Sequence, residues 1–177
     1  MKFCKPFLFL AVSFVVINNT SGQRNCEFKI DTAKILVNKN LDSLLSEFQN
    51  DSFKITNNIS DIPWFIKKNL NCLTHGFSIA NTGKSYQPTD VITKRLPKRQ
   101  LIFLAKSKTM LVMTYFTGGL GLSRHVLMIK FKAKKIIDFQ TCSFINGMST
   151  KEDIINNLKQ NRNKERELHN GKIYFTL

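Results

Sequence analysis

The sequence predicts an α+β fold: an antiparallel β-meander of four to six strands, with N-terminal helices and one C-terminal helix packed on it. Three observations lead to this prediction. Apolar residues at helical spacing come first, four apolar runs follow one another across residues 100–142, and a helical pattern returns near residue 150. Helices grouped before and after consecutive strands are typical of α+β proteins rather than of alternating βαβ units.

The first helical region is expected over residues 31–48. Apolar residues of its second half lie at helical spacing behind Asn40, a candidate N-cap, and its first half is either helix or strand. A polar linker follows, with a candidate short strand at 53–56.

A second helix is expected to begin at Ser60 or Asp61, which are candidate caps, and to end before Gly76. Trp64 lies on the apolar stripe of this helix. We therefore expect Trp64 in the core.

Strands follow this helix. A short one is expected at 77–80, and then four apolar runs are separated by very short connections: 100–106, 109–116, 125–131 and 135–142. Short connections require antiparallel neighbours, so these runs form a meander. The first two runs are apolar at nearly every position, which indicates a sheet covered on both faces.

The C-terminal helix is predicted over residues 150–161, because Ser149 and Glu152 have the spacing of a capping box in front of an apolar stripe. Residues 172–177 are a candidate last strand.

Residues 1–22 have the pattern of a secretory signal peptide. Two lysines precede an apolar run at 7–17, and a small polar segment follows it. The run is shorter than the roughly 20 residues that span a bilayer, so no membrane-spanning segment is expected after cleavage. The prediction is a secreted or periplasmic protein whose residues 23–177 form a single domain.

Three cysteines remain after cleavage: Cys26, Cys72 and Cys142. An exported protein with three thiols can form at most one internal disulfide, and the sequence leaves the pair open. Cys72 and His75 have a C-x-x-H spacing without a second ligand pair, so neither a metal nor a cofactor is expected.

The chain has a formal net charge of +15. No carboxylate occurs between Asp90 and Asp138, a span that holds eleven basic residues. Such a region attracts anions. A binding role is therefore predicted, with an anionic polymer, a membrane surface or an acidic protein as the partner. Export argues against nucleic acid. The candidate binding residues are Lys94, Arg95, Lys98, Arg99, Arg124, Lys132, Lys134 and Lys135. The alternative is that lysine-rich composition only protects strand edges.

An enzyme is the alternative function, and it depends on how the last two strands of the meander pair. If Phe131 faces Ile136, continuing the ladder places His125 opposite Cys142. That pair would be the activated nucleophile of a cysteine-dependent hydrolase or acyl transferase, for which Cys72 is the other candidate thiol.

A second register pairs Lys130 with Asp138 and moves Cys142 opposite Val126, on the other face from His125. This register separates charged from apolar residues better. The pattern therefore favours it over the catalytic arrangement.

The segment HVLMIKFKAKKIID, from His125 to Asp138, resembles the His-hairpin of papain-like and transglutaminase-like cysteine enzymes. The resemblance implies a catalytic role for His125 and Asp138. In those families the nucleophilic cysteine opens a helix, whereas Cys72 lies near the predicted end of one, where the helix dipole disfavours a thiolate. Binding is therefore predicted over catalysis.

Overall fold

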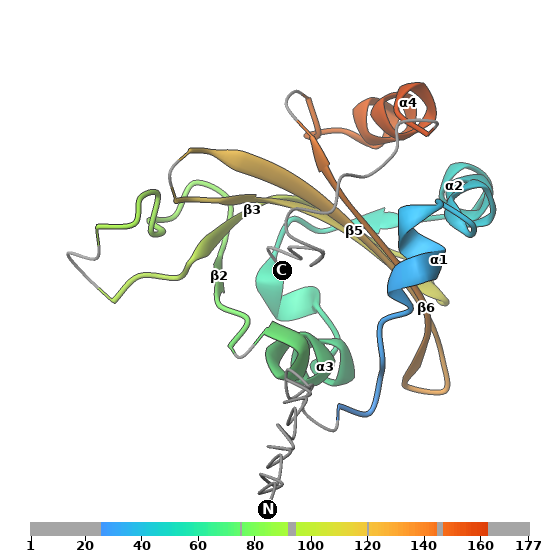
Figure 1. Ribbon diagram of the computed structural model, residues 1–177, viewed down its shortest axis with the longest axis horizontal. Helices are drawn as coiled ribbons and strands as arrows, with labels where there is room; N and C mark the ends of the chain where they lie inside the picture. Colours follow the sequence, from blue (N-terminus) through green and yellow to red (C-terminus); the bar gives the residue numbers. More distant parts are fainter. Residues whose placement is uncertain (1–25, 75, 92–94, 120, 145–146, 163–177) are drawn as a thin grey trace, which may run out of the picture.

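The computed structural model describes residues 26–74, 76–91, 95–119, 121–144 and 147–162. A six-stranded sheet lies between helices that cover both of its faces (Figure 1). The helices are α1 (Thr32–Leu36), α2 (Leu41–Asn50), the 3-10 helix η1 (Ile59–Asp61), α3 (Trp64–Thr74) and α4 (Lys151–Gln160). The strands are β1 (Lys54–Ile55), β2 (Ile79–Ala80), β3 (Arg99–Lys106), β4 (Met110–Thr117), β5 (Ser123–Lys132) and β6 (Lys135–Phe144). The predicted signal peptide, 1–22, and the candidate last strand, 172–177, lie outside the described residues.

The α+β fold with an antiparallel meander is confirmed. The strand order is β1-β3-β4-β5-β6, and β3 to β6 are consecutive antiparallel neighbours. The exception is the short strand β2, which lies parallel to the start of β3. It can pair in this direction because the long loop 81–98 returns the chain to the same end of the sheet.

Each face of the sheet has its own core. On one face, Ile66 and Leu70 of α3 pack with Leu111 and Met113 of β4. On the other, α2 and α4 pack against the alternate residues of the same strands. The six residues from Met110 to Tyr115 are all fully buried, which explains why β4 is apolar at nearly every position.

The expected N-terminal helix is two helices. The chain breaks after α1 at Asn38, which has a φ of 51°, and α2 begins at Leu41. Asn40 does not cap α2 with its side chain. Its Nδ2 instead donates to Asp138 Oδ1 at 2.7 Å and to the Phe139 carbonyl at 3.2 Å, which ties α2 to β6.

The other two helices differ from the prediction in detail. The side chain of Thr150, not Ser149, caps α4 by accepting from the Asp153 amide at 3.1 Å. The expectation that Trp64 is core is wrong, because the residue is 64% exposed. It opens α3 on the side of the helix that faces away from the core, which Phe65 and Ile66 fill.

Candidate functional sites

The pairing of β5 with β6 separates His125 from Cys142. Cys142 lies opposite Val126, as in the register that the charge pattern favours, and it packs in the core under α2 and α4. His125 lies opposite Ser143 and faces the α3 side, where it stacks on Tyr115. The imidazole and this thiol are therefore on opposite faces of the sheet.

Both pairings of β5 with β6 that the sequence allows occur in the same hairpin. Phe131 faces Ile136 next to the turn, whereas Lys130 pairs with Asp138, because a bulge at Ile137 shifts the ladder by one residue. The two-residue turn determines the pairing near the loop. Burial of apolar side chains determines it farther along the strands.

The other residues of the predicted catalytic group have partners other than His125. Cys72 forms a disulfide with Cys26, with a Cα–Cα distance of 5.9 Å, so this sulfur is not a thiolate in the structure. Asp138 accepts from Lys34 Nζ and Asn40 Nδ2 at the far end of β6. The described structure thus does not bring His125 together with Cys142, Cys72 or Asp138.

His125 instead belongs to a polar cluster that is buried except at Ser143, which is exposed. The ring is 3% exposed, its Nε2 is 2.8 Å from Thr117 Oγ1, and its Nδ1 is 3.0 Å from Ser143 Oγ. The ring stacks on Tyr115 with a centroid distance of 5.2 Å. Burial, and secondarily the charge of Arg99, lower the pKa of His125 to about 4, so the imidazole is neutral near pH 7.

Arg99 is the charged member of this cluster. It is 6% exposed, lies opposite Thr117 in the sheet, and has its guanidinium 4.8 Å from the centre of the Phe77 ring. The Tyr115 phenol is close enough to the guanidinium to act on its pKa. Among the described residues, no acceptor reaches Nε or Nη1 of Arg99, and no carboxylate lies within 4 Å of the guanidinium.

Burial affects both partners in this contact. Desolvation lowers the pKa of Arg99, which the neighbouring Tyr115 partly offsets. Desolvation also raises the pKa of Tyr115 well above its ordinary value, so the phenol keeps its proton. We define the Arg99 cluster as Arg99, Tyr115, Thr117, His125 and Ser143.

Most of the Arg99 cluster was not predicted as a site from the sequence. Arg99 and His125 were candidates for different roles, and Thr117 and Ser143 were not singled out. The available signal was the group of polar residues near the end of the otherwise apolar β4. Interpreting it requires the strand register, which places Tyr115 opposite His125 and Thr117 opposite Arg99.

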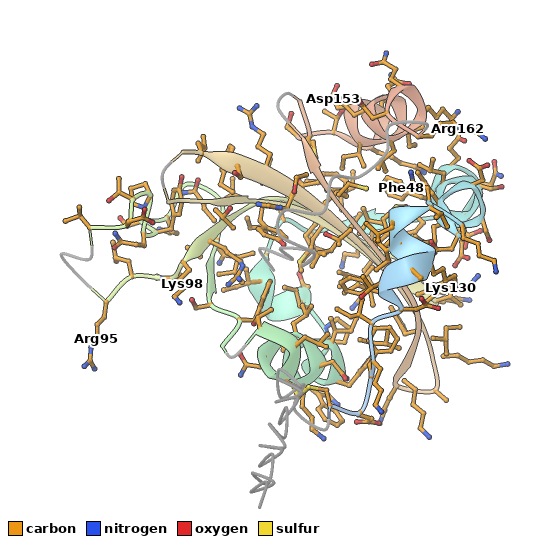
Figure 2. All side chains as sticks on the ribbon, in the orientation of Figure 1. Phe48, Arg95, Lys98, Lys130, Asp153 and Arg162 are labelled. Carbon is orange, nitrogen blue, oxygen red and sulfur yellow. A yellow bond between two sulfur atoms is a disulfide. The ribbon has the colours of Figure 1, made fainter. Side chains whose placement is uncertain are left out.

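The predicted anion-binding residues lie at two opposite ends of the sheet. Arg95, Lys98 and Arg99 lie where β3 begins, and Arg124 lies near the start of β5. Lys132, Lys134 and Lys135 form the β5–β6 turn, roughly 25 Å away along β5 at about 3.3 Å per residue. Figure 2 shows Arg95 and Lys98 on one side of the molecule and Lys130 on the other. Lys94 lies outside the described residues.

We call the second of these regions the lysine end. It contains lysines from β1, the β3–β4 connection and the β5–β6 hairpin: Lys54, Lys106, Lys108, Lys132, Lys134 and Lys135. Lys54 lies opposite Lys106, and Lys132 lies opposite Lys135. None of the six forms an ion pair with a described carboxylate. The nearby carboxylates of Glu47 and Asp138 are paired with Lys130 and Lys34.

Exposed apolar side chains accompany these lysines. Ile55 follows Lys54 and is 53% exposed, and Ile137 occupies the bulge of the hairpin and is also 53% exposed. Trp64 joins the same end through ring contacts, because its ring centre is 6.3 Å from that of Phe65, which is 5.4 Å from that of Phe131.

No family model matches the chain, and no curated protein or solved structure is significantly similar to it. In the part of the chain that the structure describes, no helix is long and apolar enough to cross a membrane. The same residues contain no group of three or more His, Cys, Asp or Glu side chains that could hold a metal ion.

Proposed function

We propose that this protein binds anionic phospholipid surfaces through the lysine end, with Trp64 entering the headgroup region. The observation that carries the proposal is an exposed tryptophan at the same end of the molecule as six lysines that have no carboxylate partner among the described residues. The expected export would place the protein outside the cytoplasm, where lipid surfaces are accessible to it.

The charges of the lysine end suit an extended, diffuse partner. Each ammonium group is a hydrated point charge on a flexible stem, whereas arginine forks favour defined bidentate contacts. Near an anionic membrane each such charge contributes about 1 kcal/mol to binding. Lysines spread over the turns of several strands can meet many headgroups at once.

Trp64 distinguishes a lipid surface from the other anionic partners. An indole has an apolar body and one N–H donor, and tryptophan is enriched at the membrane–water interface for this reason. Ile55 and Ile137 add exposed apolar area beside the lysines. A soluble polyanion would pair with the lysines but would leave these three side chains in water.

The test uses Trp64 as its own reporter, because it is the single tryptophan of the chain. Its fluorescence is recorded while vesicles of phosphatidylcholine, with or without phosphatidylglycerol, are added. We expect a blue shift and protein co-sedimentation with the anionic vesicles only, and both should weaken as salt is raised.

A matched pair of triple variants separates the surface from the net charge. Lys132→Gln/Lys134→Gln/Lys135→Gln should weaken partitioning by about a hundredfold. Lys84→Gln/Arg95→Gln/Lys98→Gln removes the same charge from exposed residues at the opposite end and should change partitioning much less. Equal losses in both variants would refute the lysine end as the binding surface. Binding to heparin without binding to vesicles would indicate a polymer partner and refute the lipid proposal.

A further inference from the structure

The Arg99 guanidinium is an unusual buried charge. Charged side chains are almost never buried without a partner, because an isolated ion loses several kcal/mol of hydration that only paired groups restore. Phe77 contacts the guanidinium with its ring face, and Tyr115 offers a neutral hydroxyl. Two of the three guanidinium nitrogens still have no acceptor among the described residues.

The rest of the Arg99 cluster cannot supply the missing negative charge. The phenol of Tyr115 keeps its proton, and His125 is neutral or positive at any pH that the fold experiences. The carboxylate of Asp90 lies on the nearby loop, next to Gly119, but it does not reach the guanidinium within 4 Å. The guanidinium of Arg99 is therefore a positive charge surrounded, within the cluster, by uncharged hydrogen-bonding groups.

The hydroxyl groups around His125 add donors for an anion. A neutral imidazole donates one hydrogen bond and accepts one, and here both ring nitrogens face hydroxyl oxygens. Whichever hydroxyl accepts from the ring, Thr117 or Ser143, keeps its own proton for another acceptor. Thr117 lies directly opposite Arg99 in the sheet, so the two side chains are cross-strand neighbours on the same face.

We propose that the Arg99 cluster binds a small oxyanion, a phosphate-like or carboxylate group that accepts hydrogen bonds from the guanidinium and from a hydroxyl of the cluster. Charge-assisted hydrogen bonds of this kind are about twice as strong as neutral ones, and burial of the guanidinium strengthens them further. This site is distinct from the lysine end, and neither proposal depends on the other.

Residues 81–91 and 95–98 pack at the end of the sheet where β3 begins. The Lys98 amide donates to Ser78 Oγ at 3.0 Å, and Gln100 Nε2 donates to the Lys84 carbonyl at 2.6 Å. The loop also lies against Gly118, where an added Cβ would come within 2.4 Å of the Gln87 carbonyl oxygen. Ser143 of β6 is exposed, so a small anion reaches the cluster from solvent on that side.

The test is thermal unfolding of the full chain in phosphate, sulfate, acetate and chloride at equal ionic strength. A ligand that binds only the folded state raises the Tm, by about 4 °C at a concentration roughly tenfold above Kd. We expect this rise with at least one oxyanion and not with chloride. A response to acetate alone would assign a carboxylate ligand, and a response to phosphate or sulfate alone would assign a tetrahedral one.

Three variants assign the effect to its residue. Arg99→Met should abolish the oxyanion-dependent rise, whereas Lys98→Gln and the triple variant of the β5–β6 turn should keep it. A rise of the same size in Arg99→Met, or no rise in the wild type, would overturn the proposal. If Arg99→Met does not fold, the Arg99 Nε–H resonance of the wild type gives a second readout, because phosphate or acetate should shift it saturably. An unchanged resonance would also refute the site.

Discussion

The two ends of the sheet are both basic, but only one of them buries a charged group. The lysine end exposes ammonium groups on turns and strand ends, whereas the other end buries one guanidinium under Phe77 beside Tyr115. An exposed charge is screened within about 10 Å at 0.1 M salt and acts on extended partners. A buried charge is strong at short range and demands a specific partner. The two proposed sites therefore differ in the solvent exposure of their charged groups, not in the sign of the charge.

The largest expected difference between the two ends is the effect of acid pH on the free energy of unfolding. His125 resists protonation in the folded state until about pH 4, whereas the unfolded chain takes up this proton near pH 6.5. The unfolded state thus binds more protons between these values, and the free energy of unfolding falls as pH decreases from 6.5 to 4. The loss due to His125 should be roughly 3 kcal/mol, measured by urea unfolding across this range.

The variant His125→Gln isolates this term, because an amide retains hydrogen bonding without titrating in that range. Its free energy of unfolding should decrease less with acid than that of the wild type. Lys132→Gln, at the lysine end, should keep the wild-type pH dependence. The same acid slope in His125→Gln and the wild type would contradict the assignment.

An intermediate effect is expected at the β5–β6 turn. Ala133 and Lys134 have φ angles of 49° and 63°, which are unfavourable for residues with a Cβ and typical of a type I′ turn. Replacing the pair with Asn-Gly should stabilise the protein by about 1 kcal/mol, because these residues adopt the left-handed region readily. Denaturant midpoints measure the gain. An unchanged or lower midpoint would show that the turn carries no such strain.

The smallest effect is expected for the exposed lysines themselves. Lys132 and Lys135 are like charges on directly opposed residues, so Lys132→Gln or Lys135→Gln should raise the free energy of unfolding slightly, by less than about 0.5 kcal/mol. The gain should shrink in high salt. A large loss of stability in either variant would mean that these lysines are structural, which would weaken the binding proposal.

The sequence by itself determined the local elements and their order. The meander follows from apolar runs joined by links too short for anything but antiparallel neighbours. Helices α2, α3 and α4 follow from apolar spacing. The candidate caps were wrong: the side chain of Asn40 bonds to β6, Ser60 and Asp61 lie in η1 before α3, and Thr150 caps α4. The meander and the helices depend on residues close together in the chain, and periodicity alone predicts them.

Tertiary structure decided what surrounds each side chain. The bulge at Ile137 allows both registers in one hairpin, which no alternation pattern specifies. At about 100° per residue, Trp64 lies on the other side of α3 from the buried positions 65, 66, 69 and 70, so it is on the exposed side of the helix. His125 meets Tyr115 and Thr117, not a thiol, because the pairing of separate strands determines which side chains share a face. Burial of Arg99 depends likewise on β2, β4 and Phe77 together. Residues distant in the sequence create the low-dielectric setting that distinguishes Arg99 from an exposed lysine.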